Sequence, residues 1–148
     1  MSTISVKTRA WNDIELIRHA RPYRMAVIEL ICAVAGQNPT YRVVFSEFGQ
    51  NVCTSAIRTA NTGTYNVGIA AGVFKNTSNV SINTTITYNA TTTGAPATYT
   101  EMYVSGYFDS SANPAYTNIR IVTAAAPGTT NTDLVGKMLV VLKEYYYG

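Results

Sequence analysis

The sequence predicts an all-β fold: an antiparallel β-sandwich or jelly roll of about eight strands with an N-terminal arm. One reason is that apolar and polar residues alternate with a period of two in several segments, as they do on the two faces of a strand. The other is composition. Charged residues make up 13% of the 148 residues, against the about 25% usual for soluble domains, and Thr, Asn, Ser and Tyr supply the polarity. Because Thr and Tyr fit a pleated sheet, this composition favours strands.

The beginning of the chain differs from the rest and predicts an arm. Four of its apolar residues stand close together among polar and basic ones: Trp11, Ile14, Leu16 and Ile17. Asn12 or Asp13 is a suitable cap for one short helical turn, and Pro22 ends any helix because the residue before a proline disfavours the α region. We therefore expect an arm over residues 1–22, whose four apolar side chains make docking or oligomer contacts, and a sandwich domain over residues 23–148.

The domain is expected to open with a long apolar strand and a hairpin. Residues 25–34 (MAVIELICAV) are apolar almost throughout, which predicts a strand that is covered on both faces or lies at a subunit interface. Residues 35–39 (AGQNP) form a strong turn cluster. Residues 40–47 and 52–59 are then separated by a tight turn at 48–51, so we expect the two to pair as a hairpin.

Two later segments alternate most regularly. In residues 64–70 (TYNVGIA), the predicted apolar face holds Tyr65, Val67 and Ile69. In residues 79–88 (NVSINTTITY), it holds Val80, Ile82, Thr84, Ile86 and Tyr88. Such period-two order cannot make an amphipathic helix, so both segments are predicted to be strands with one apolar face.

The last third of the chain predicts three more strands. They cover residues 98–108, 116–123 and 136–147, and residues 89–97 and 124–132 are expected to be loops. The apolar stretches MAVIELICAV and MLVVL at the two ends of the domain also suggest that a partner subunit covers part of the sheets.

Three tyrosines in the strand predicted over residues 98–108 are candidates for binding. They are Tyr99, Tyr103 and Tyr107. A tyrosine offers a flat apolar ring for stacking on a sugar and a hydroxyl for hydrogen bonding. A tyrosine stripe on a strand is also typical of a core edge or a subunit interface, so these residues are either ligand-facing or interface residues.

The residues that usually carry catalysis or bind metals are sparse. The single histidine, His19, lies in the arm without a nucleophile or an acidic residue beside it to complete a triad. The acids are scattered, and neither zinc-ligand spacing nor a phosphate-binding glycine motif occurs. We therefore expect no enzyme, no cofactor and no metal. Cys32 and Cys53 lack C-x-x-C spacing and are expected to be buried free thiols, with a disulfide between adjacent strands as the alternative.

Charge and hydropathy narrow the possible partners. The net charge is +3, but no basic run is dense enough to predict specific nucleic-acid binding. The chain shows neither the apolar core of a secretory signal nor a segment long enough to span a membrane. We expect a soluble protein that is synthesised in a cytoplasm.

Two segments resemble the two ends of short β-rich domains that recur in phages and prophages of the Bacteroidota. The first runs from YRMAV through AGQNPTYRVVFSEFGQNVCTSAIRTANTGTYNV, and the second is NIRIVTAAAPGTTNTDLVGKMLVVLKEY. The likeness covers residues 23–147, although residues 75–96 are not clearly matched. The resemblance implies a virion structural role as a fibre, head-decoration or tail-associated protein, often in trimers.

The leading hypothesis is therefore a phage structural protein located in the virion. Its arm would dock on capsid or tail proteins, and its β domain would associate with copies of itself, with a trimer favoured. The alternative is a host-surface or glycan-binding module that uses loops such as residues 91–97 and 123–131. A small enzyme ranks third.

Overall fold

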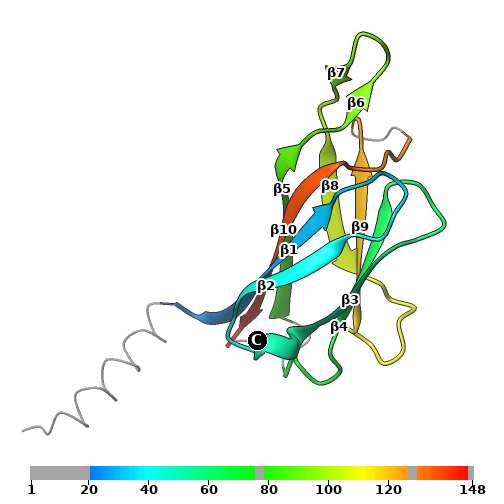
Figure 1. The fold of residues 1–148 in the computed structure, drawn as a ribbon. Helices are drawn as coiled ribbons and strands as arrows, with labels where there is room; N and C mark the ends of the chain where they lie inside the picture. The colour runs from blue at the N-terminus through cyan, green and yellow to red at the C-terminus, as the bar shows by residue number, and fades with distance from the viewer. Residues whose placement is uncertain (1–20, 76–78, 127–129, 147–148) are drawn as a thin grey trace, which may run out of the picture.

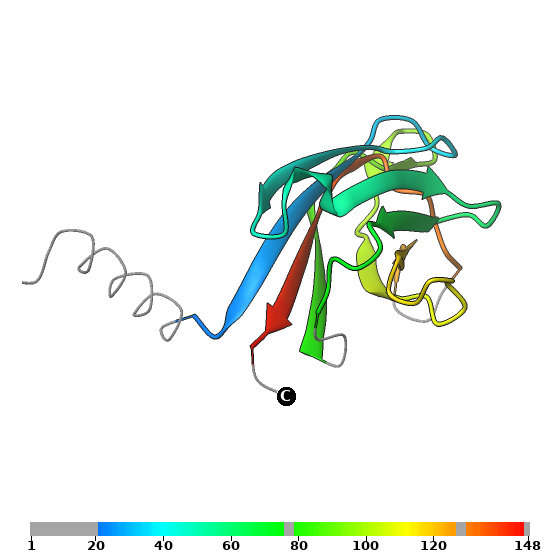
Figure 2. The same ribbon diagram turned by 90° about the horizontal axis from the view of Figure 1, so that it is seen from below.

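The computed structural model describes residues 21–75, 79–126 and 130–146. Its strands are β1 (Tyr23–Cys32), β2 (Thr40–Ser46), β3 (Cys53–Arg58), β4 (Thr64–Ile69), β5 (Val80–Asn89), β6 (Thr92–Thr93), β7 (Thr98–Tyr99), β8 (Tyr103–Phe108), β9 (Asn118–Ala124) and β10 (Gly136–Tyr145). Eight of them build two four-stranded antiparallel sheets, with the orders β2-β1-β10-β5 (sheet I) and β3-β4-β9-β8 (sheet II). The sheets stack against each other (Figures 1 and 2), so the predicted all-β sandwich is confirmed.

The first and last strands lie side by side in the middle of sheet I. β1 pairs with β10 from Tyr23↔Tyr145 to Cys32↔Gly136, which brings the two ends of the domain together (Figure 1). Alternate residues of both strands are buried in the core: Ala26, Ile28, Leu30 and Cys32 from β1, and Met138, Val140 and Leu142 from β10. The period-two pattern therefore sets which side chains face inward.

Of the two alternatives for residues 25–34, cover on both faces is wrong for the described part of the chain, and a subunit interface stays a prediction. Buried and partly exposed residues alternate along β1, and the strand ends at Cys32. Val34 lies beyond the strand and is 60% exposed. Among the residues that the structure describes, the other sheet covers the inner face alone, because each sheet of a sandwich meets a single partner layer.

The inner face of sheet II completes the core. Tyr65, Val67 and Ile69 of β4 are buried as their alternation predicts. Ile119 and Ile121 of β9 lie beside them and are fully buried.

The predicted hairpin between residues 40–47 and 52–59 is wrong. β2 pairs with β1, whereas β3 pairs with β4 in the other sheet. The chain crosses between the sheets through Gly49 and the short 3-10 helix Gln50–Val52, and it buries Val52 in the core. This apolar contact directs β3 to the opposite layer instead of back along β2.

The segment predicted as one strand over residues 98–108 is divided. β7 pairs with β6 in a small hairpin that projects from one end of the domain (Figure 1), and β6 lies within the predicted loop 89–97. β8 begins at Tyr103 and pairs with β9. The break occurs because the chain changes hydrogen-bonding partner: Thr100 donates its N–H to Thr91, whereas Tyr103 lies opposite Ala124.

A β-bulge moves Tyr88 off its predicted face. Lys137 lies opposite Tyr88 and Met138 opposite Ile86, so Thr87 is an extra residue in β5. One extra residue reverses the alternation. As a result Ile86 packs against the core, whereas Tyr88 is 57% exposed.

The two sheets meet closely at β5 and β8. A Cβ atom added to Gly106 of β8 would lie 2.7 Å from Cγ2 of Thr84 on β5. Aromatic side chains pack edge to face near another corner, with ring centroids 5.4 Å apart for Phe48 and Phe74 and 5.7 Å apart for Phe74 and Phe108. These contacts fix the two layers relative to each other.

Candidate functional site

The predicted docking residues of the arm lie outside the described residues. They are Trp11, Ile14, Leu16 and Ile17, and His19 lies outside as well. The start of the described chain is held against the domain: the Arg21 guanidinium pairs with Glu47, and Tyr146 donates its N–H to Pro22. The docking role of the arm stays a prediction.

Two of the three candidate tyrosines share one face. Tyr103 and Tyr107 lie on the outer side of β8, where they are 42% and 48% exposed. Tyr99 belongs to the separate β6–β7 hairpin and is 73% exposed. The predicted stripe of three is therefore a pair, and we call the outer surface of sheet II the tyrosine face.

A row of side chains crosses the tyrosine face from edge to edge. The strand register places Ile57 of β3 opposite Asn66 of β4, Asn66 opposite Arg120 of β9, and Arg120 opposite Tyr107 of β8. Directly opposite residues on the same face of an antiparallel sheet are within side-chain reach of each other. An apolar group, an amide, a guanidinium and a phenol thus stand in line.

An ion pair neutralises the only guanidinium of this row. Arg120 Nη2 lies 2.8 Å from Asp109 Oδ2, and the Asn118 amide donates to the same oxygen at 3.3 Å. Oδ1 of Asp109 accepts hydrogen bonds from the Ser111 hydroxyl at 2.6 Å and the Ser111 N–H at 2.9 Å. These bonds, helped by Arg120, hold the pKa of Asp109 below its ordinary value.

Part of the hydrogen-bonding capacity of the row is unused. Among the described residues, neither Asn66 Oδ1 nor Arg120 Nε has a hydrogen-bond partner, although both atoms are buried. Buried polar atoms are nearly always paired, so an unpaired acceptor and donor on adjacent strands are unusual. The fold itself does not account for them.

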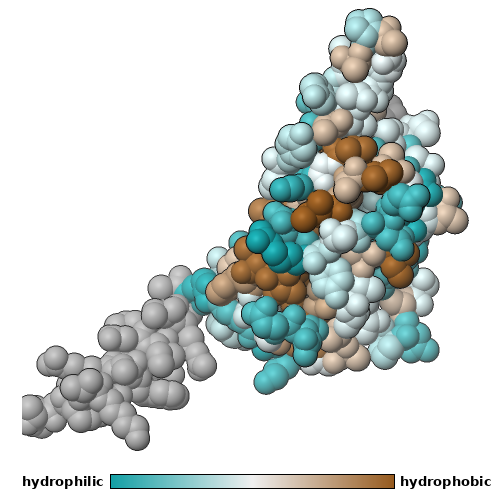
Figure 3. Space-filling model, in the orientation of Figure 1, coloured by the Kyte–Doolittle hydropathy of each residue, from teal (hydrophilic) through white to brown (hydrophobic). Residues whose placement is uncertain are grey.

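The outer surface of sheet I carries a group of apolar side chains, and we call it the apolar face. Its partly exposed or exposed side chains are Val27 and Ile31 of β1, Phe45 of β2, and Leu139 and Val141 of β10. Figure 3 shows hydrophobic side chains gathered among hydrophilic ones over these strands. In the part of the chain that the structure describes, no second layer covers this surface.

Charged and hydroxyl side chains lie within and around the apolar face. Glu29 stands outward between Val27 and Ile31, opposite Leu139, and forms an ion pair with Arg42 at 3.3 Å. Lys137 and Lys143 lie outward on β10. Ser81, Asn83 and Thr85 of β5 also point outward, and so does the larger Tyr88. A surface that combines apolar side chains with polar ones is typical of a protein–protein interface.

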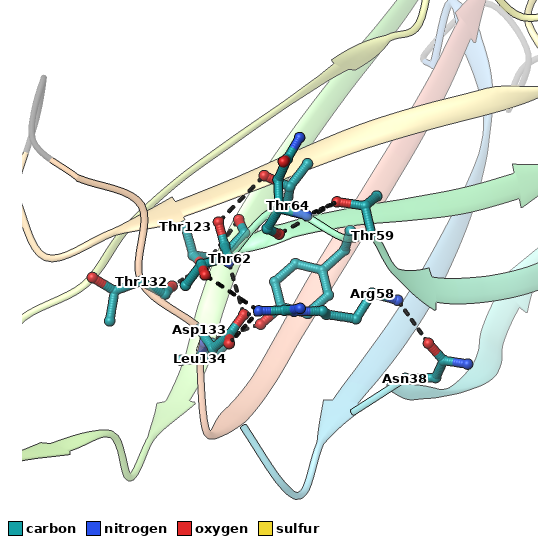
Figure 4. Close-up of polar contacts among 12 residues, drawn as sticks. Asn38, Arg58, Thr59, Thr62, Thr64, Thr123, Thr132, Asp133 and Leu134 are labelled. Atoms are coloured by element: carbon teal, nitrogen blue, oxygen red, sulfur yellow. Dashed lines mark hydrogen bonds and ion pairs between the residues drawn. The ribbon is translucent and has the colours of Figure 1, made fainter. Parts of the chain in front are cut away.

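A polar cluster joins the turn after β3 to the loop before β10 (Figure 4). The Arg58 guanidinium donates two hydrogen bonds, of 3.1 and 2.9 Å, to the Asp133 carboxylate. The Gly63 N–H donates to the same carboxylate at 2.7 Å. Burial alone would raise the pKa of Asp133, but these hydrogen bonds hold it below its ordinary value. Within the cluster, the Tyr65 hydroxyl accepts the Leu134 N–H at 3.0 Å.

This cluster is structural rather than catalytic. The Asp133 carboxylate is already bound by an arginine and a backbone N–H, so it is a poor general base. Burial raises the pKa of Tyr65 to about 12, which leaves its phenol protonated at neutral pH. The cluster fastens the loop that leads from sheet II into sheet I.

Cys32 and Cys53 are both buried and free, as predicted. Burial raises the pKa of each thiol to about 11. A thiol with such a pKa carries almost no thiolate at neutral pH and is a poor nucleophile.

The described residues contain no group of three or more His, Cys, Asp and Glu side chains placed to hold a metal ion. No helix among them has the length and hydrophobicity that crossing a bilayer requires. No protein-family model, curated protein or solved structure matches the chain. Its function is therefore inferred from the two outer sheet faces.

Sequence reasoning singled out Tyr103 and Tyr107 but missed Asn66 and Arg120. Both stand at outward positions of strands whose inward positions are apolar, so their exposure was readable from the alternation. Their place beside Tyr107 depends on strand order and register, which the alternation does not encode.

Proposed function

We propose that this protein is a non-catalytic structural subunit of a phage virion that works by binding copies of itself through the apolar face. The observation that carries the proposal is the group of Val27, Leu139 and Val141 on the central strands of sheet I, with charged and hydroxyl side chains beside them. Removing such apolar area from water is the main driving force of protein association.

A second copy of the chain is the partner that suits this surface best. Symmetric assembly brings the same surface patches together around an axis, so like charges near the centre would repel. Glu29, which lies within the apolar face opposite Leu139, is neutralised by its ion pair with Arg42, and Lys143 adds a charge of the opposite sign. This surface supports a homo-oligomer, and the sequence resemblance favours a trimer.

The virion setting rests on the resemblance to phage domains and on the predicted arm. In this proposal the arm docks on capsid or tail proteins, while sheet I holds the copies together. The low share of charged residues, 13%, leaves a hydroxyl-rich outer surface.

The oligomeric mass of the full chain tests self-association. Light scattering coupled to size exclusion is expected to show an oligomer for the wild type and a monomer for Val141→Asp. Val122→Asp is the matched control, because Val122 lies at an outward, partly exposed position on a central strand of sheet II. A monomeric wild type, or an oligomeric Val141→Asp protein, overturns the proposal.

The virion role is tested by mass spectrometry of purified particles. A chain without residues 1–20, which keeps the Arg21–Glu47 pair, is expected to fold and self-associate but not to enter particles. Incorporation of this shortened chain at the wild-type level would refute the docking role of the arm.

A further inference from the structure

The tyrosine face presents two tyrosine rings at a fixed spacing, and each ring is a platform on which a flat ligand group can stack. Tyr103 and Tyr107 are four residues apart on β8, which corresponds to roughly 13 Å along a strand. Only Ser105, a small residue, stands outward between them. Because the backbone of both tyrosines is held in the ladder with β9, the rings are presented without the entropy cost of ordering a loop.

Hydrogen-bonding groups lie beside one of these platforms. Arg120 is directly opposite Tyr107, and Asn66 is directly opposite Arg120. Nε of Arg120 is a donor and Oδ1 of Asn66 is an acceptor, and both lack partners among the described residues. A hydroxyl group donates and accepts at once, so it can satisfy both kinds of atom once the side chains that cover them move aside.

The charge of the row selects against an anionic ligand. Asp109 occupies Arg120 at 2.8 Å, so a phosphate, sulfate or carboxylate would compete with a carboxylate already in place. The other members of the row, Ile57, Asn66 and Tyr107, are uncharged. A ligand rich in hydroxyls and without charge fits this chemistry.

We propose that the tyrosine face binds a neutral oligosaccharide. Tyr103 and Tyr107 stack on separate sugar rings, and Arg120 and Asn66 bind hydroxyls of the ring over Tyr107. The separation of the two tyrosines requires a chain of linked rings, because one sugar ring is too small to reach both. This site lies on sheet II and is independent of self-association through sheet I.

The tyrosine face differs from the apolar face in a way that favours a ligand over another copy of the chain. Its central strand β9 carries Asn118 and Arg120 outward beside Val122, whereas β10 carries Leu139 and Val141 outward at the centre of sheet I. Binding sites for small polar ligands combine aromatic surface with a few placed polar groups, which is the composition seen here.

A glycan array of neutral and acidic oligosaccharides, probed with the full-length protein, is the first test. Neutral oligosaccharides are expected to bind and acidic ones are not. The best neutral oligosaccharide is then titrated by calorimetry as a free, monovalent ligand, so that a change in oligomeric state does not alter the apparent affinity.

Single substitutions then locate the site. Tyr107→Ala and Tyr103→Ala are each expected to weaken binding about tenfold or more, and Asn66→Ala by a smaller factor. Tyr99→Ala is the matched control, because Tyr99 is also exposed but lies on the β6–β7 hairpin. It is expected to bind like the wild type. Far-UV circular dichroism checks that each variant keeps its strands.

Three results overturn the inference. The first is an array on which no neutral oligosaccharide binds. The second is a folded Tyr107→Ala protein whose affinity for the oligosaccharide is unchanged. The third is a Tyr99→Ala protein that loses as much affinity as Tyr107→Ala. Val141→Asp separates this inference from the proposed function, since it removes self-association and leaves the sugar affinity unchanged if both are correct.

Discussion

Arg24 and Glu144 face each other across the first and last strands of the domain, with Nε of the arginine 2.7 Å from Oε1 of the glutamate. Glu144 is only 4% exposed, and its other carboxylate oxygen accepts the Lys75 N–H at 2.5 Å. Arg24 also donates to the Val73 carbonyl at 3.0 Å, and its guanidinium lies 4.4 Å from the centre of the Phe48 ring. The pair therefore fastens β1 and β10 to the segment before β5.

Glu144→Gln is expected to lower the free energy of unfolding by about 3 kcal/mol or more, because it leaves the Arg24 charge buried without its counter-ion. Urea denaturation measures the loss. The control is Glu29→Gln, which removes the pair with the largely exposed Arg42 and should cost at most about 1 kcal/mol. Equal losses in the two variants would contradict the structural importance of the Arg24–Glu144 pair.

The Arg58–Asp133 contact predicts a loss of stability in acid. The folded pKa of Asp133 is lowered, so its stabilisation is fully present above the unfolded-state pKa of about 3.9 and is lost as the pH falls through the folded pKa. Unfolding free energies measured between about pH 2 and pH 6 should therefore fall less steeply in Asp133→Asn than in the wild type. If the unfolding free energies of the two proteins fell in parallel with pH, the Asp133 carboxylate would not contribute to the pH dependence of stability.

Both thiols are expected to resist alkylation in the folded protein at pH 8. Cys32 is 2% exposed and Cys53 is 5% exposed, and the raised pKa of each leaves little thiolate. Iodoacetamide followed by mass spectrometry should show no label in native buffer and two labels in urea. Rapid labelling without denaturant would place a thiol at the surface, and a missing label in urea would indicate a disulfide.

Gly136→Ala is expected to destabilise the domain more than Gly106→Ala. A Cβ atom at Gly136 would lie 2.0 Å from the backbone oxygen of Tyr88, which the β10–β5 ladder holds in place. At Gly106 the obstacle is a side-chain methyl group of Thr84, at 2.7 Å. Overpacking typically costs about 1 to 3 kcal/mol, and we expect Gly106→Ala in that range and Gly136→Ala above it. Thermal unfolding shows which of the two variants is less stable. A less stable Gly106→Ala protein would contradict the close approach of Gly136 to the Tyr88 backbone.

The alternation of apolar and polar residues predicted the features that each strand has by itself, such as which of its side chains face the core. It indicated correctly that Tyr65, Val67 and Ile69 face inward, and that the chain ends in a long strand, β10. Period-two order is a local property, since successive side chains of any extended backbone point to opposite sides. Burial of both cysteines followed in the same way from their apolar surroundings.

The pairing of strands could not be read from that pattern. Residues 40–47 and 52–59 have the spacing of a hairpin. However, Val52 is buried in the core and the chain continues from it into the other sheet. Tyr88 continues a regular alternation, yet the bulge at Thr87 turns it outward. In both places the outcome depends on hydrogen bonds to segments that lie far away along the chain.

The sequence by itself therefore determined the strand content, the low charge and the inward side chains of most strands, because these follow from residue type and spacing. Only the tertiary structure decided that Asn66, Arg120 and Tyr107 form one row on sheet II, and that β1 and β10 form one apolar face on sheet I. Strand order and register decide which outward residues become neighbours, and the whole chain must fold before either is fixed.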